Sequence, residues 1–106
     1  MSTKQQDILK AIQATAHQVL PNGSRAILYG SQARGDARPE SDWDILVLLD
    51  KERISLDDID EVSYPLRALG WELGENINTI LYTVDDWKRN SFTPFYKNVT
   101  KDGIAI

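Results

Sequence analysis

Apolar residues recur at helical spacing over the first twenty positions of the chain. Four of them fall three or four positions apart, which places them on one face of a helix: Ile8, Ile12, Ala16 and Val19. The run Pro21-Asn22-Gly23 that follows is typical of a helix end. The pattern predicts an amphipathic helix from about Thr3 to Leu20.

Two apolar runs further along predict strands. Ala26–Tyr29 is short and leads directly into Gly30-Ser31, which indicates a strand that enters a tight loop. Ile45–Leu49 is continuously apolar, and such a run fits a central strand covered on both faces. The polar stretch 31–41 between them contains glycine and proline and has room for one or two helical turns.

A second amphipathic helix is predicted after the second strand. Ser55 and Asp58 have the spacing of a capping box, which marks a helix start. Pro65 lacks the N–H needed inside a helix and should bend or split it, and Gly70 is the expected stop. The predicted buried stripe consists of Ile59, Val62, Leu66 and Leu69.

The last third of the chain predicts one more strand and two short helices. Ile77–Thr83 suits a pleated surface. A short helix is expected over Asp85–Arg89, and Thr93-Pro94 is a start signal for another at Phe95–Val99. The order of elements predicts a single domain over residues 1–106 with an α/β (α+β) fold: a three-stranded mixed sheet packed with helices.

Composition and charge narrow the classes of function. The chain is 42% hydrophobic and 26% charged, as in an average soluble globular protein. Its formal charge of −4 opposes binding to a polyanion, so direct nucleic-acid binding is not expected. There is no cysteine, no apolar run long enough for a membrane and no apolar leader at the N-terminus. We expect a cytoplasmic protein.

Asp42 and Asp44 are the first candidates for chemistry. They stand two positions apart at the start of the predicted central strand, so both side chains project from the same face. Two adjacent carboxylates repel each other unless a cation neutralises them, and magnesium prefers such oxygen ligands. The alternative is that Asp42 caps a turn and Asp44 is simply solvated.

Gly30 and Ser31 strengthen the metal interpretation. The glycine allows a close backbone approach at the end of the first strand. The following N–H groups and the Ser31 hydroxyl can then hold phosphate oxygens. If the two strands are antiparallel neighbours, this phosphate cradle lies beside the start of the second strand. We therefore expect the cradle and the aspartates to face one site.

The segment from Leu28 to Leu49 resembles a known signature. Gly-Ser, ten residues and then Asp-Trp-Asp before an apolar strand is similar to the DNA polymerase β-type nucleotidyltransferase superfamily. Within it, Gly-Ser-x-Ala-Arg-Gly and Ser-Asp-x-Asp resemble the minimal nucleotidyltransferases. The resemblance implies the polymerase β-like fold and transfer of a nucleoside monophosphate, AMP from ATP, onto an acceptor hydroxyl.

The resemblance also implies roles for individual residues. Gly30 and Ser31 would hold the triphosphate, and Asp42 and Asp44 would ligate Mg²⁺ as catalytic residues. Arg34 and Ser41 belong to the matched motif and are further nucleotide-binding candidates. For Arg34 a surface ion pair with Asp36 is the alternative, and for Ser41 a cap on the turn before Asp42.

Active members of the superfamily carry a third acid on a later strand. In this chain Asn78 occupies the expected position, and an amide cannot act as a general base. Glu75 is the candidate for the missing acid if the strand begins earlier; otherwise it is a solvated loop residue.

Three functions remain open from the sequence. The first is adenylylation of a partner protein, because minimal members are often the antitoxin of a HEPN-domain toxin. The second is a catalytically inactive nucleotide-binding module that neutralises its partner sterically, which Asn78 suggests. The third is transfer to a small molecule of the aminoglycoside type. The late aromatic residues indicate either core packing or a partner-binding face: Trp71, Trp87, Phe92, Phe95 and Tyr96.

Overall fold

The computed structural model describes all 106 residues and contains one mixed sheet. Its strand order is β3-β2-β1-β4, with β1 antiparallel to both β2 and β4, and β2 parallel to β3. The sheet is mixed, as predicted, and the antiparallel pairing of β1 with β2 meets the condition for a shared site. The strands are β1 (Arg25–Tyr29), β2 (Trp43–Leu49), β3 (Ile77–Thr83) and β4 (Ile104–Ala105).

The prediction of three strands is wrong by one, because β4 also joins the sheet. This strand is two residues long and both residues are exposed, so it leaves no alternation of buried and exposed positions that a sequence pattern could show. It pairs with Ile27 and Leu28 of β1. The sheet edge next to β1 is thereby covered over part of its length.

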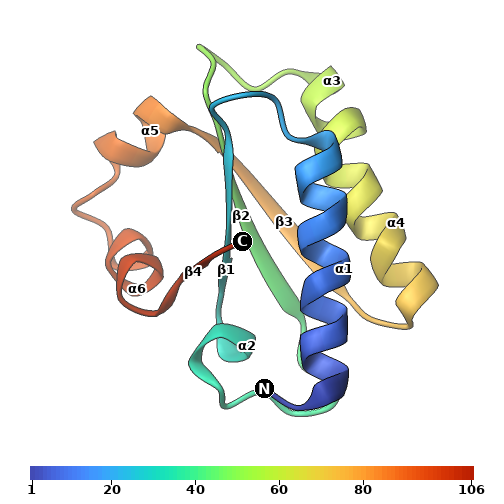
Figure 1. Ribbon diagram of the computed structural model, residues 1–106. Helices are drawn as coiled ribbons and strands as arrows, with labels where there is room; N and C mark the ends of the chain where they lie inside the picture. The colour runs from blue at the N-terminus through green and yellow to red at the C-terminus, as the bar shows by residue number, and fades with distance from the viewer.

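Helices cover both faces of the sheet (Figure 1). The long α1 (Thr3–Val19) and α4 (Tyr64–Leu73) lie on one side, and α5 (Val84–Arg89) and α6 (Pro94–Asp102) on the other. Alternate residues of β2 enter the two cores: Ile45 and Val47 pack under α1, and Leu46 and Leu48 pack under α5 and α6. A run of apolar residues is required here because neither face of β2 meets water.

The connection between β2 and β3 is a helix with an irregular middle. It begins with α3 (Leu56–Asp58), which Ser55 caps as predicted, continues as the π-helical segment η1 (Ile59–Ser63) and ends as α4. Pro65 stands in the first turn of α4. Its missing N–H interrupts the regular bonding, and the extra residue of the π turn absorbs the interruption.

Gly70 does not end this helix, contrary to the prediction. The helix continues to Leu73, and Gly74 closes it in the left-handed conformation with φ +68°. Gly70 serves close packing instead, because a Cβ there would stand 2.7 Å from the backbone oxygen of Glu75. The glycine lets the chain turn tightly into β3.

None of the helices combines the length and the apolar character that crossing a lipid bilayer requires.

Candidate active site

Asp44 and Tyr29 lie side by side at one end of the sheet. The antiparallel register pairs Tyr29 with Asp44, so the end of β1 is directly beside the start of β2. Asp42 precedes β2 by one residue. In Figure 1 this end of β1 continues into the short helix α2 (Ser31–Arg34). The loop after the first strand and the acidic pair therefore meet, as the topology predicts.

Gly30 packs directly against the Asp44 carboxylate. It has φ +77°, a conformation that L side chains rarely adopt, and a Cβ placed on it would collide with Asp44 Oδ2. Glycine is required at this position for both reasons. The close approach brings the backbone at the start of α2 to the edge of the acidic pair.

The first amides of α2 lack a capping side chain. Gly30 is the N-cap residue and makes no side-chain hydrogen bond, and the first N–H groups of a helix have no partner within it. Ser31, which is half-buried, follows with its hydroxyl. These donors can bind an oxygen-rich anion beside Asp44.

Two amide side chains converge on the aspartates, one from β3 and one from the residue just before it. Asn76 Nδ2 and Asn78 Nδ2 each donate to one oxygen of Asp42, both at 2.9 Å. Asn78 Nδ2 also lies 3.4 Å from Asp44 Oδ1. A single amide thus contacts both carboxylates, so the carboxylates point to a common position.

The donor set around this position fits a hard divalent cation. It consists of the two carboxylates and the Asn78 amide, which contacts both of them, and an amide can offer its oxygen by rotation about its terminal bond. No group of three His, Cys, Asp or Glu side chains clusters closely enough to hold a metal ion anywhere in the structure. Asp42 and Asp44 are therefore the residues that could ligate the cation, with substrate oxygens and water supplying the rest.

Glu75 lies on the other side of the sheet from this site. Its Oε1 accepts a hydrogen bond of 3.3 Å from the indole Nε1 of Trp43, a fully buried residue of the core under α1. It lines a cavity of about 410 Å³ with Gln32 and Arg38. A buried indole N–H needs an acceptor, so Glu75 has a packing role here. The structure does not bring it to the aspartates.

The remaining sequence candidates, Arg34 and Ser41, have partners outside the acidic pair. Arg34 Nε lies 3.3 Å from Asp36 Oδ2 in an exposed ion pair. The Ser41 hydroxyl accepts a hydrogen bond of 2.8 Å from the backbone N–H of Arg38. Arg34 thus forms the surface ion pair, and Ser41 the turn cap, that were the alternatives to nucleotide binding.

Two residues that the sequence did not single out help to position the site. Asn76 holds Asp42, and the almost fully buried Gln32 donates to the backbone oxygen of Ser41 at 3.3 Å. Gln32 in turn accepts from Gln5 of α1 at 3.1 Å. This chain of contacts fixes the residue before Asp42. Only the position of Gln32 inside the Gly-Ser motif could have indicated it.

Tyr29 stays protonated beside the acidic pair. Burial and then the Asp44 carboxylate raise the pKa of Tyr29 from 10.0 to about 12, with a smaller contribution from Tyr82. Its ring packs edge-on against Phe95 of α6, with centroids 5.3 Å apart. At pH 7 the Tyr29 side chain is therefore uncharged, and it lies between the aspartates and α6.

The chain is similar to a known protein family and to solved structures. A family model described as a nucleotidyltransferase domain matches residues 8–106. A crystal structure from Sulfolobus solfataricus, of a protein provisionally assigned as a nucleotidyltransferase, superposes with a TM-score of 0.61 at 25% sequence identity. The match covers 96% of this chain and 81% of that one. No curated protein matches the sequence.

Proposed function

The chain belongs to the nucleotidyltransferase domain family. From this premise we propose that it transfers AMP from ATP to a hydroxyl group of a partner protein: the hydroxyl oxygen bonds to the α-phosphorus, the α–β phosphoanhydride bond breaks, pyrophosphate leaves and the hydroxyl proton passes to solvent. In this proposal Asp42 and Asp44 hold Mg²⁺, while Gly30 and Ser31 hold the triphosphate. The observation that carries it is the contact of Asn78 with both carboxylates, at the place where Gly30 packs on Asp44.

Bound magnesium would act as a Lewis acid on the phosphoryl group, supplying transition-state stabilisation of several kcal/mol. The chain's own residues position the reactants. The amides and hydroxyl at the start of α2 orient phosphate oxygens, and Asn76 and Asn78 keep the Asp42 carboxylate in one orientation. Such positioning converts an encounter between two substrates into a reaction within one complex.

The acceptor in this proposal is a protein that reaches the aspartates from the solvent-exposed side of the site, at the start of β3. Asn76 and Asn78 are both exposed, so an acceptor hydroxyl can approach the aspartates from solvent. The acidic net charge argues against a nucleic-acid acceptor. The resemblance of the Gly-Ser and Asp-x-Asp motifs to minimal nucleotidyltransferases suggests a HEPN-type helical toxin as the partner, with this chain as its antitoxin.

Labelled ATP tests the proposal. The protein is incubated with Mg²⁺, ATP labelled on the α-phosphate and a helical protein encoded beside it. We expect label on the partner, and at least about 100-fold less with Asp44→Asn, since the lost metal ligand removes several kcal/mol of stabilisation. Asp85→Asn is the matched control, an exposed aspartate of α5 that should leave labelling unchanged. A bound but unlabelled partner would refute transfer to protein.

A second candidate is steric neutralisation without turnover, which the amide at position 78 and the absence of a three-acid cluster favour. The double variant Asp42→Asn/Asp44→Asn separates the two. A steric inhibitor keeps neutralising its partner when both carboxylates are lost, whereas an adenylylating enzyme does not.

A further inference from the structure

Large apolar side chains form a strip on the outer side of the helical connection between β2 and β3. Tyr64 and Trp71 are 57% and 66% exposed, and Ile59, which the helical pattern predicted to be buried, is 46% exposed. They line one shallow groove of about 190 Å³, together with Asp60, Ser63 and Arg67. We call these three apolar residues the α4 strip. Contiguous exposed apolar groups of this kind mark interaction sites rather than ordinary surface.

The two aromatic rings of the strip pack against each other. Tyr64 and Trp71 lie edge to face, with centroids 5.9 Å apart and planes at 80°. Each ring restricts the other, so a partner that contacts them would lose little additional side-chain entropy on binding. Aromatic residues held in this way are frequent binding anchors.

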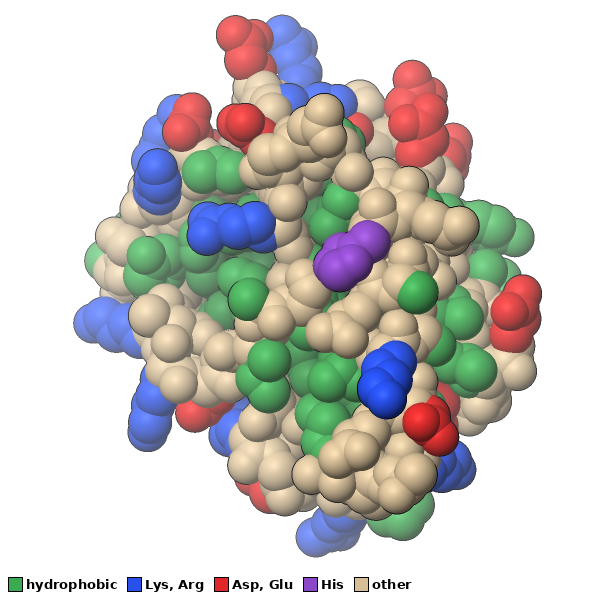
Figure 2. Space-filling view, viewed as in Figure 1, with side chains coloured by type: hydrophobic (Ala, Val, Ile, Leu, Met, Phe, Trp, Pro, Cys, Tyr) green, Lys and Arg blue, Asp and Glu red, His purple; other side chains and the backbone are tan.

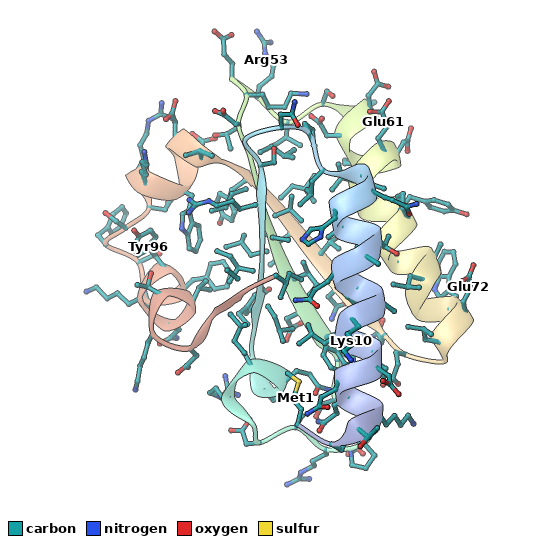
Figure 3. The ribbon with its side chains drawn as sticks, viewed as in Figure 1. Met1, Lys10, Arg53, Glu61, Glu72 and Tyr96 are labelled. Atoms are coloured by element: carbon teal, nitrogen blue, oxygen red, sulfur yellow. The ribbon has the colours of Figure 1, made fainter.

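The helical connection that carries the strip is mainly acidic, although Asp60 and Arg67 both line the groove. Figure 3 shows Glu61 and Glu72 on the outer side of these helices, and Figure 2 shows acidic and hydrophobic side chains together along the same edge of the molecule. Arg67 is the only basic residue between Leu56 and Leu73, and it makes no salt bridge. The acidic residues of this stretch are Asp57, Asp58, Asp60, Glu61 and Glu72, of which Asp58 alone is buried.

Charge and shape together define the partner. A surface with exposed acids around an apolar strip is complementary to a basic, amphipathic surface, and it repels a second copy of itself. The strip runs from residue 59 to residue 71, roughly 18 Å along a helical axis. That length and the groove between the strip residues suit a helix with apolar residues on one face and Lys or Arg beside them.

We propose that the α4 strip is the docking surface for a basic amphipathic helix of a partner protein. The strip contains none of the residues of the candidate active site. The proposal therefore goes beyond the proposed transferase activity and stands or falls separately from it.

Fluorescence anisotropy of labelled model peptides tests this surface. One probe is a Leu/Lys peptide of about five helical turns with its leucines on one face, and the other has Glu in place of every Lys. We expect saturable binding of the Lys peptide, weaker binding at high salt and no binding of the Glu peptide. Tyr64→Ala/Trp71→Ala should weaken binding about tenfold or more, the usual loss for truncated anchors.

Matched variants make the result decisive. Phe92→Ala removes an aromatic ring that is 74% exposed in the turn between α5 and α6, and it should bind the peptide like the original protein. Tyr64→Ala alone should give a smaller loss in the same direction, and circular dichroism checks that each variant is folded. Equal losses for Phe92→Ala, or equal binding of both peptides, would overturn the proposal. So would a dimer in sedimentation that Trp71→Ala dissociates, because the strip would then bind a second copy.

Discussion

At the scale of single residues, glycine and asparagine shape the site as much as the aspartates do. Gly30 permits contact between the loop and Asp44. Asn78 occupies the position where the resemblance to active nucleotidyltransferases implies an acid, and it donates to the pair instead of repelling it. Three carboxylates at this place would repel one another strongly without a cation. The amide keeps Asp42 and Asp44 together in the free protein.

Replacing Gly30 tests whether the close approach matters. Gly30→Ala places a methyl group against the Asp44 carboxylate and forces alanine into φ +77°. The backbone strain costs about 1–3 kcal/mol, and the displaced carboxylate should lower transfer activity and Mg²⁺-dependent ATP binding. Denaturant unfolding and calorimetric titration with Mg-ATP measure the two effects.

Gly35→Ala is the control, because Gly35 has a similar φ of +86° but open space where the Cβ would be. It should lose comparable stability and keep its ATP affinity. If both variants lose affinity equally, the contact between Gly30 and Asp44 is not what positions the carboxylate.

At the scale of elements, the start of the crossover helix depends on one buried carboxylate. Asp58 accepts hydrogen bonds from Lys51 Nζ at 2.8 Å and from the backbone N–H of Ser55 at 2.7 Å. Ser55 is the N-cap residue, and its hydroxyl oxygen accepts a hydrogen bond from the backbone N–H of Asp58. These partners lower the pKa of Asp58, the Lys51 hydrogen bond most of all. They hold the first turn of α3 to the end of β2.

Asp58→Ala should therefore destabilise the protein by about 1–2 kcal/mol, as the loss of a helix cap does. Urea unfolding measures the change. Asp57→Ala is the matched control, since Asp57 is an exposed acid in the same first turn, and it should cost less than half as much. A similar cost for both would mean that helix electrostatics, rather than the capping contacts of Asp58, stabilises this turn.

The elements differ in how far the sequence predicted them. The first helix was predicted because burial of one face imposes a helical period on it, and the central strand because burial of both faces leaves a continuous apolar run. The end of the crossover helix was misplaced, because a glycine used for close packing has the same sequence signal as a helix stop. The paired Asp42 and Asp44 could be predicted from alternation along one strand. The contacts of Asn76 and Glu75 depend on the tertiary fold, which no local pattern encodes.

At the scale of the whole molecule, Asp58 makes the stability fall at acid pH and Tyr29 makes it fall at alkaline pH. The pKa of Asp58 is lowered from 3.8, so its contribution is present above that pH and lost as the pH falls through the folded value. The pKa of Tyr29 is raised from 10.0 to about 12, so its contribution is present below 10 and lost as the pH rises toward 12. We expect these two groups to leave stability level between those limits.

Urea unfolding across the pH range measures both limits. Tyr29→Phe should remove the loss of stability associated with Tyr29 between pH 10 and 12 and leave the acid side unchanged, because phenylalanine has no proton to release. Asp58→Asn should flatten only the acid side. If Tyr29→Phe loses as much stability between pH 10 and 12 as the original protein, another group is responsible for that loss.

The strand register decides which part of the sequence signature is free to vary. Moving the start of β2 by one residue would turn both aspartates into the core and Trp43 out of it. The segment from Gly35 to Ser41, in contrast, contains no regular element that must keep a register. We expect a change of length before the turn at Arg38–Ser41 to disturb the site less than a shift of the β2 register does. Searches for distant homologues should therefore require Gly-Ser and Asp-x-Asp and allow a variable number of residues between them.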